Sequence, residues 1–318
     1  MLSKAVVQLG RRQLHLVQNF SKRVANFEWS GASQGIEMAT TPPSSWYTSQ
    51  EFASSVEQKH TFNKWLLICN DSTLKNDGDY VARTVNNQPI VIVNSQGTLK
   101  AFYNVCRHHA AQLCDDGDGK LGPTGRFSCP YHGWQYNADG KLVKALHMKG
   151  CKEFSAKNFG LHSLRLDKLG PWLYVNLDKH GTGTLLEDCP DLTHMHSLLA
   201  NTQYESLVPV KCLSYEIGCN WKVFVDNYLD GGYHVPVAHP ALTASLNLSG
   251  YTRSGFDNFY LQTCGAKTDE SEPVPHDNNN SNNNHEGAVK KGEHSRISGG
   301  GNTEALYIFQ YPNVMINM

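Results

Sequence analysis

Two short loops, each with a cysteine close to a histidine, constrain this 318-residue chain more than any other feature. In the first loop, Cys106 and His108 are separated by one residue. The second loop reads Cys129-Pro130-Tyr131-His132-Gly133-Trp134. Thiolates and imidazoles are both strong ligands of transition metals. The two loops therefore predict a metal centre with four ligands, which are Cys106, His108, Cys129 and His132.

The division of these ligands between the loops indicates the kind of centre. In a Rieske [2Fe–2S] cluster, two cysteines hold one iron and two histidines hold the other. Zinc sites usually take both cysteines from one knuckle and both histidines from another. Here each loop supplies a mixed pair, which favours the Rieske cluster over the alternative, a Cys2His2 zinc site. The Cys-x-His spacing selects His108 as the ligand, and His109 is expected at the surface or behind the ligands.

Two positions in the second loop indicate a low reduction potential. Tyr131 and Trp134 stand where Rieske proteins of the respiratory chain have a disulfide-forming cysteine and a serine that donates to a cluster sulfur. Fewer hydrogen bonds to the sulfurs favour a lower potential. We therefore expect a cluster suited to feeding electrons to an oxygen-activating site.

A second set of candidate ligands follows a predicted helix over residues 220–230. Asp226, Asp230 and His234 are four residues apart, so on a continuous helix they would share one face. His234 and His239 are five apart, which an ideal helix turns about 140° from each other. Binding of one ion by both histidines therefore requires a bend, for which three residues provide the means: Gly231, Gly232 and Pro236. Two histidines and one carboxylate form the facial triad of non-haem Fe(II) oxygenases.

The remaining chain divides into pieces of different composition. We predict a leader at 1–27, a linker with a helix at 28–60, a β domain at 61–178 and a second domain at 179–318. Short β-branched and aromatic runs broken by turn residues indicate a small antiparallel β structure for the first domain. The Asn- and Gly-rich residues 268–302 cannot bury enough apolar area to fold, so they are predicted to be a disordered insertion.

The leader and the overall composition bear on location and partners. Residues 1–27 are basic and contain no acidic residue, which is typical of a transit peptide. We expect an organelle matrix, mitochondrial rather than plastid or cytoplasmic, with an ordinary basic arm as the alternative. The net charge of −1 suggests no nucleic-acid partner. No apolar run approaches the roughly 18 residues of a membrane span. Of the nine cysteines, those outside the cluster are expected to be reduced thiols.

Together these motifs resemble the large subunit of the Rieske non-haem iron oxygenases. The segment Asp226-Asn227-Tyr228-Leu229-Asp230-Gly231-Gly232-Tyr233-His234 is most similar to the choline monooxygenases of that family. The similarity runs from about Ser45 to the C-terminus, with an interruption near 268–302. It implies an α+β fold, in which a small antiparallel β Rieske domain precedes a helix-grip-like catalytic domain with an antiparallel sheet.

The resemblance also implies an activity. Choline, or a related quaternary amine, would be oxidised with O2 to betaine aldehyde, a step of glycine betaine biosynthesis. Electrons from a ferredoxin or a reductase would pass through the [2Fe–2S] cluster to a mononuclear Fe(II), held by His234 and His239 in the next subunit of a homotrimer. Many family members place a carboxylate that links the two iron sites three residues before the first iron ligand. Here that position is Gly231, so Asp226 or Asp230 would take the role.

One expected ligand is missing. The family's third iron ligand, an Asp or Glu, lies on a C-terminal helix, further beyond the His pair than this chain extends past His239. We therefore expect a catalytic domain that is truncated before this ligand. A cluster-bearing electron-transfer protein, or an inactive oxygenase-like protein, is then the alternative function. A zinc-binding structural domain is a third possible function.

A quaternary ammonium offers no hydrogen bonds, so its site is expected to be an aromatic cage that acts through cation–π attraction. Tyr307, Phe309 and Tyr311 alternate in a predicted strand and would share one face. That face can meet a pocket or fill the core, and the sequence leaves both open.

Overall fold

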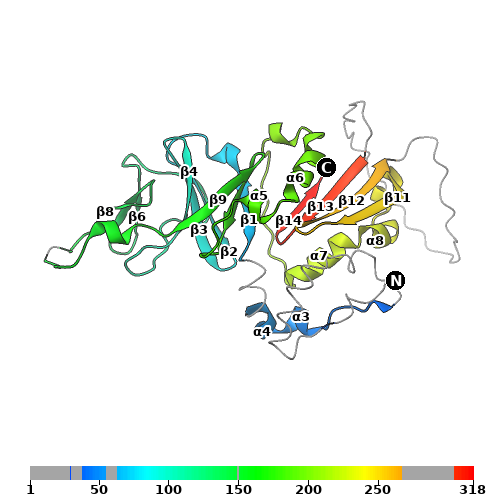
Figure 1. Ribbon diagram of the computed structural model, residues 1–318, viewed down its shortest axis with the longest axis horizontal. Coiled ribbons are helices and arrows are strands. Elements are labelled where there is room, and N and C mark those ends of the chain that lie inside the picture. The colour runs from blue at the N-terminus through cyan, green and yellow to red at the C-terminus, as the bar shows by residue number, and fades with distance from the viewer. Residues whose placement is uncertain (1–28, 30–37, 55–62, 149, 267–303) are drawn as a thin grey trace, which may run out of the picture.

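The computed structural model describes residues 29, 38–54, 63–148, 150–266 and 304–318. The predicted leader and the predicted Asn-rich insertion lie outside these residues. The molecule is elongated, with one β-rich half at each end (Figure 1). Both halves are built on antiparallel sheets, as the resemblance implied. None of the helices in the described ranges has the length and hydrophobicity needed to cross a bilayer.

The first half contains a seven-stranded antiparallel sheet. In sheet order its strands are β1 (Trp65–Asn70), β10 (Trp172–Asn176), β9 (Ser163–Leu169), β4 (Thr98–Tyr103), β3 (Gln88–Ser95), β2 (Asp79–Val85) and β5 (Gly117–Lys120). The β-branched run of β3 is buried on both faces, which explains its continuous apolar sequence. A 3-10 helix, η4 (Asp71–Thr73), follows β1. The strands predicted from alternation and turn residues are confirmed here.

A smaller three-stranded sheet carries the second cysteine–histidine loop between its first two strands. Its strands are β6 (Arg126–Ser128), β7 (Gln135–Asn137) and β8 (Leu142–Lys144), followed by the 3-10 helix η5 (Ala156–Phe159). We call residues 126–159 the tip subdomain. It forms the far left end of the molecule in Figure 1.

The second half is a four-stranded antiparallel sheet between two layers of helix. Its strands, in order, are β11 (Leu246–Gly255), β12 (Phe259–Ala266), β13 (Glu304–Gln310) and β14 (Val314–Asn317). Helix α6 (Leu192–Ala200) packs on one face, while α7 (Trp221–Leu229) and α8 (Gly231–Ala238) cover the other. Helix α9 (Pro240–Ser245) connects α8 to β11. The helix predicted over 220–230 is confirmed, and Asn220 caps it by accepting a hydrogen bond from the backbone N–H of Lys222.

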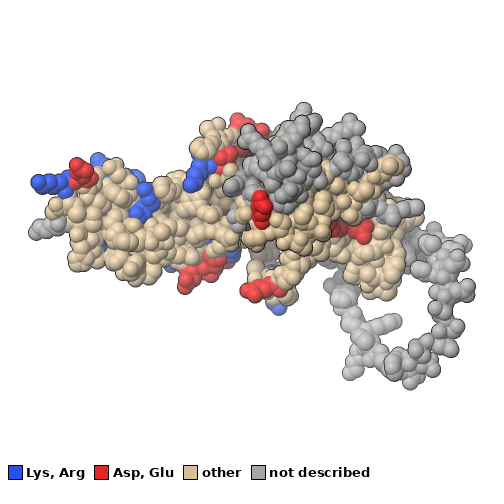
Figure 2. All heavy atoms as spheres, turned by 90° about the horizontal axis from the view of Figure 1, so that it is seen from below, with Lys and Arg blue, Asp and Glu red and all other residues tan. Residues whose placement is uncertain are grey.

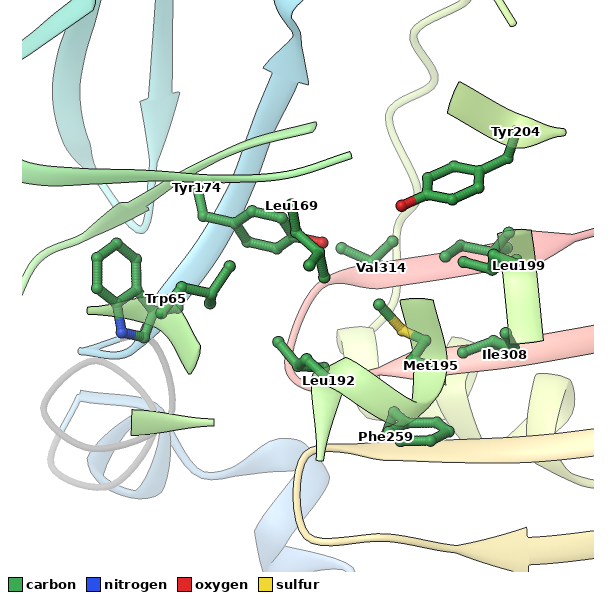
Figure 3. Close-up of a cluster of buried hydrophobic side chains, with 12 residues drawn as sticks. Trp65, Leu169, Tyr174, Leu192, Met195, Leu199, Tyr204, Phe259, Ile308 and Val314 are labelled. Carbon is green, nitrogen blue, oxygen red and sulfur yellow. The ribbon is translucent and has the colours of Figure 1, made fainter. Parts of the chain in front are cut away.

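One hydrophobic cluster joins the two halves. Trp65 and Tyr174 from the first sheet belong to the same buried cluster as Leu192 and Met195 of α6 and Ile308 of β13 (Figure 3). The Tyr174 hydroxyl donates to Oε1 of Gln310 at 2.7 Å, across the boundary between the halves. The two halves therefore share a core.

Short helices complete the connections. Helices α3 (Ser45–Thr48) and α4 (Gln50–Phe52) precede β1, and α5 (Leu185–Asp188) and η6 (Tyr204–Ser206) flank α6. The Thr184 hydroxyl and the Glu187 carboxylate form a capping box at α5.

Candidate metal centres and substrate pocket

The first cysteine–histidine loop meets the second, which belongs to the tip subdomain, on the inner side of its sheet. The Cys106 N–H donates to the carbonyl of Ala111, and the Cys129 N–H donates to the carbonyl of Trp134, both at 2.8 Å, so each loop folds back on its own cysteine. Gly133 has φ +69°, a left-handed conformation that favours glycine in the turn after His132. The loops are therefore fixed by their own backbone hydrogen bonds.

Both thiols are buried, whereas a histidine ligand is at the surface. Cys106 and Cys129 are 3% and 5% exposed, and His108 is exposed. Burial raises the pKa of the Cys106 thiol above its ordinary value. A cation is thus needed to hold it as the thiolate that binds metal. The Tyr136 hydroxyl lies 3.3 Å from Cys106 Sγ and accepts a hydrogen bond from the Arg107 N–H at 3.0 Å.

This tyrosine qualifies the expectation of a low potential. Once Cys106 is a metal-bound thiolate, only the Tyr136 hydroxyl can donate in this contact. The cluster site thus retains one hydrogen bond to a ligand sulfur, although Tyr131 and Trp134 replace the residues of the respiratory proteins.

The imidazoles converge on the same point. The ring centroids of His108 and His132 are 4.8 Å apart, and the Trp134 ring stacks on His108 with an interplanar angle of 4°. Desolvation, together with the neighbouring imidazoles of His109 and His132, lowers the pKa of His108 and favours the neutral form that binds metal. A ring nitrogen from each of these three histidines lies within 4.8 Å of the others. His109 is thus close to the ligand pair.

This donor set fits a Rieske cluster. Two buried thiols lie below two imidazoles, the asymmetric arrangement that places sulfur on one iron and nitrogen on the other. The Trp134 Nε1–H is buried and has no hydrogen-bond partner among the described protein atoms.

The predicted iron ligands are brought together by a break in the helix. Helix α7 ends at Leu229 and α8 starts at Gly231, with Asp230 between them in a non-helical conformation. The ring centroids of His234 and His239 are 5.3 Å apart, at an interplanar angle of 74°. The bend expected from the five-residue spacing is therefore present, and it aims both imidazoles at one region.

The two candidate carboxylates are separated by the same break. The Asp230 carbonyl lies 3.2 Å from His234 Nδ1, and its carboxylate oxygen Oδ2 lies 3.9 Å from that nitrogen. Asp226 instead accepts a hydrogen bond from the Tyr47 hydroxyl of α3 at 2.7 Å. Although residue Asp226 is exposed overall, partial desolvation raises the pKa of its carboxyl, while Tyr47 and Lys222 oppose that rise. Asp230 is thus the carboxylate beside the histidine pair.

A pocket of about 210 Å³ opens beside the two histidines. Three tyrosine rings line it, from Tyr228 on α7, Tyr251 on β11 and Tyr307 on β13. The apolar part of the wall is formed by Val235, Leu242, Leu246 and Leu248. Burial raises the pKa of Tyr228 and Tyr251 well above the ordinary range, so both hydroxyls stay protonated.

The aromatic strand is divided between this pocket and the core. Tyr307 lines the pocket, whereas Phe309 and Tyr311 pack with Leu229 and Tyr260 under α7. Tyr307 and Phe309 share a face of β13 as predicted, whereas Tyr311 lies in the turn after the strand, and of the three only Tyr307 lines the pocket.

Close packing holds α8 against the sheet. A Cβ on Gly231 would lie 2.7 Å from the Tyr251 hydroxyl oxygen, and a Cβ on Gly232 would lie 2.3 Å from Nη2 of Arg253. Gln262, only 1% exposed, accepts from the Tyr251 hydroxyl at 2.8 Å and donates to the carbonyl of Tyr228 at 3.0 Å. The glycine pair thus allows the helix to approach β11 closely enough for His234 to reach the pocket.

Sequence reasoning did not identify Tyr251 and Gln262 as pocket residues. Tyr251 alternates with Arg253 in a strand, and only pairing with β12 places it opposite the histidines. In the part of the chain that the structure describes, no third His, Cys, Asp or Glu joins His234 and His239 in a metal-binding group.

Family comparisons agree with both halves of this description. Residues 64–155 match the Rieske [2Fe-2S] domain, and residues 204–318 match the catalytic domain of the ring hydroxylating alpha subunit.

Similar proteins cover both parts of the chain. Chloroplastic choline monooxygenase of Arabidopsis thaliana is 33% identical over 98% of this chain and 70% of its own length. The carnitine monooxygenase oxygenase subunit of Escherichia coli (strain K12) is 32% identical over 73% of this chain and 61% of its own length. A solved quaternary ammonium Rieske monooxygenase superposes with a TM-score of 0.70 at 25% identity, over 88% of this chain and 68% of that one. This chain thus spans only part of each of these relatives. With its cluster loops, histidine pair and sheet, the chain belongs to the Rieske non-haem iron monooxygenases, a family whose cofactors are a [2Fe–2S] cluster and a mononuclear iron.

Proposed function

We propose that this protein is the oxygenase component of a quaternary ammonium monooxygenase, and that it oxidises choline to betaine aldehyde in glycine betaine biosynthesis. The composition of the pocket is the main support for this proposal. It combines a pair of metal-ligating imidazoles with three neutral tyrosine rings. A trimethylammonium group cannot form hydrogen bonds, and neutral aromatic faces attract it by about 0.5–2 kcal/mol each.

The charge of the wall favours choline over a carboxylated substrate such as carnitine. None of the described lining residues is Lys, Arg, Asp or Glu. Arg253 stacks over the Tyr251 ring at 5.0 Å but is not part of the lining. A carboxylate entering the pocket would therefore lose its water without gaining an ionic partner among the side chains of the wall.

The protein residues divide into two groups that hold the cofactors. Cys106, His108, Cys129 and His132 would hold the [2Fe–2S] cluster, and His234 with His239 would hold the iron. When bound, the cluster supplies single electrons and the iron activates O2. The net reaction consumes choline, O2, two electrons and two protons, and yields the hydrate of betaine aldehyde and water.

Asp230 orients the first iron ligand. Its carbonyl accepts the Nδ1–H of His234, which leaves Nε2 to face the metal. Its carboxylate, 3.9 Å from the same nitrogen, is the group that would link this site to a cluster histidine of a neighbouring subunit in a homotrimer. Asp226, which accepts a hydrogen bond from Tyr47, would instead hold α7 against α3.

The electron donor and the location are part of the same proposal. A ferredoxin or a reductase would reduce the cluster, and the basic residues of 1–27 favour an organelle matrix, mitochondrial first.

The decisive experiment measures iron, sulfide and turnover on anaerobically purified protein. We expect about three irons for every two sulfides, a Rieske spin-resonance signal after reduction, and betaine aldehyde from choline. The His234→Ala variant should lose one iron and all turnover while keeping the Rieske signal. The neutral isostere 3,3-dimethylbutan-1-ol and the zwitterion carnitine should both be poorer substrates than choline. Equal turnover of the neutral isostere would contradict the aromatic-cage argument.

A second candidate function rests on the ligands found among the described residues. Because no third ligand joins His234 and His239 within the described ranges, an electron carrier without oxygen activation is the alternative. Two irons per two sulfides, with a Rieske signal and no turnover, would support it.

A further inference from the structure

The tip subdomain carries positive charge that the whole chain does not share. Arg126, Lys144, Lys152 and Lys157 are exposed, and none of them forms an ion pair with a described carboxylate. The formal net charge of the chain is −1, so this excess is local. In Figure 2, blue spheres outnumber red ones at the left end of the molecule. We call these four residues the basic face.

Two members of the basic face, Arg126 and Lys144, lie on the outer side of the sheet that covers the cluster loops. Phe127 and Tyr136 point inward and pack with both cysteines. On the outer side, Arg126 donates to the side chain of Gln135 at 3.1 Å, and Gln135 pairs in register with Lys144. Arg126 and Lys144 therefore both flank Gln135 on the outer face of the sheet. The cluster site lies on the opposite, inner face of the same sheet.

The other two lysines also border this site. Phe154 and Phe159 pack edge-on against Trp134, with ring centroids at 5.8 and 5.9 Å. Lys152 and Lys157 lie in this same segment and are exposed, so the segment that packs on Trp134 carries both charges on its surface.

Two exposed apolar side chains lie at the second cluster loop. Tyr131 is 65% exposed and Leu146 is 40% exposed. Leu146 Cδ1 lies 3.1 Å from where a Cβ on Gly133 would be, so it packs on the second cluster loop. Tyr131 packs on His132, on the side that a neighbouring subunit approaches in the proposed homotrimer, so it is separate from the basic face.

We propose that the basic face is the docking surface for an acidic one-electron carrier protein. This inference rests on the proposed function, because that reaction needs an external reductant. The carrier gives up one electron and is oxidised, the cluster gains that electron and is reduced, and the cycle repeats to deliver two. A basic patch beside the electron entry point attracts an acidic carrier and speeds encounter, and salt screens that attraction.

The test measures docking separately from oxygenation. A photoreduced acidic [2Fe–2S] ferredoxin is mixed with the oxidised holoprotein, and the bimolecular rate of cluster bleaching is followed from low to high salt. The Lys144→Glu/Lys157→Glu variant should be at least tenfold slower at low salt, and its rate should depend less on salt. It should also bind the oxidised ferredoxin more weakly in a calorimetric titration.

The matched control makes the same charge change elsewhere. Lys75 and Lys211 are also exposed, and Lys75→Glu/Lys211→Glu alters net charge equally outside the tip subdomain. This control should keep most of the wild-type rate. An equal loss in both variants, or no loss in either, overturns the docking surface.

A failure of docking can be told apart from a failure of the proposed function. Protein reduced by dithionite needs no carrier, so in a single turnover both variants should form as much betaine aldehyde as wild type. Absence of product from dithionite-reduced wild-type protein would contradict the proposed function. The rates of cluster reduction by the ferredoxin would still test the docking surface.

Discussion

At the scale of single residues, the cluster potential depends on the Tyr136 hydroxyl. This hydroxyl is fully buried and lies 3.3 Å from Cys106 Sγ. A hydrogen bond to a ligand sulfur stabilises the reduced cluster, because reduction adds negative charge. A net contribution of about 1 kcal/mol corresponds to roughly 40 mV for one electron. We expect Tyr136→Phe to lower the potential by this amount in a redox titration followed by spin resonance.

The control is a buried tyrosine far from the cluster. Tyr174 donates to Gln310, so Tyr174→Phe also removes a buried hydrogen bond. It should lower stability while leaving the potential unchanged. An unchanged potential in Tyr136→Phe would show that this hydroxyl does not donate to the bound cluster.

The pocket tyrosines give a second prediction at the same scale. Tyr307 contributes a ring to the wall, and loss of a cation–π contact of about 0.5–2 kcal/mol weakens binding roughly 2- to 30-fold. Tyr307→Leu should raise the dissociation constant for choline by this factor, whereas Tyr307→Phe, which keeps the ring, should bind nearly as wild type. Phe309→Leu is the comparison, because Phe309 packs in the core under α7 and does not line the pocket. Its loss should lower stability more than it weakens choline binding. Calorimetric titration of the anaerobic protein measures all three.

At the scale of elements, the contact between α8 and β11 controls the iron site. A Cβ at residue 231 would be 2.7 Å from the Tyr251 hydroxyl oxygen, closer than real contacts allow. Gly231→Ala should therefore push α8 from the sheet, at a cost of about 1–3 kcal/mol, and lower the mononuclear iron content. Gly265→Ala on β12 is the control, since a Cβ there meets nothing within 4 Å. Chemical denaturation and iron analysis measure both effects, and equal iron content in the two variants would contradict this role for the glycine.

The elements around the two metal centres show which features the sequence could predict and which it could not. Both cluster loops, the break after α7 and the strand containing Tyr307 follow from ligand chemistry, helix geometry and alternation, which are local properties. The contact of Tyr47 with Asp226 and that of Gly231 with Tyr251 join residues far apart in the chain. Nothing in the spacing around Asp226 indicates that a tyrosine from α3 occupies its carboxylate. Periodicity could place Asp226, Asp230 and His234 on one face only for a continuous helix, and the break at Asp230 removes that condition.

At the scale of the whole molecule, the two halves are joined through the core around α6. Met195 is fully buried in this core, which also contains side chains from strands of both sheets (Figure 3). Deleting such a side chain costs about 2–5 kcal/mol. Because both sheets pack on this cluster, the loss should destabilise both halves by similar amounts rather than one alone.

Met195→Ala tests this coupling between the halves. Cluster bleaching in denaturant reports on the first half, and hydrogen exchange of the β12 and β13 amides reports on the second. Both midpoints should move to lower denaturant together. Met38→Ala removes the same atoms from a residue that is 63% exposed, and should move neither. A shift in β13 exchange with the bleaching midpoint unmoved would mean that the halves unfold independently, and that the shared core does not transmit stability to the cluster.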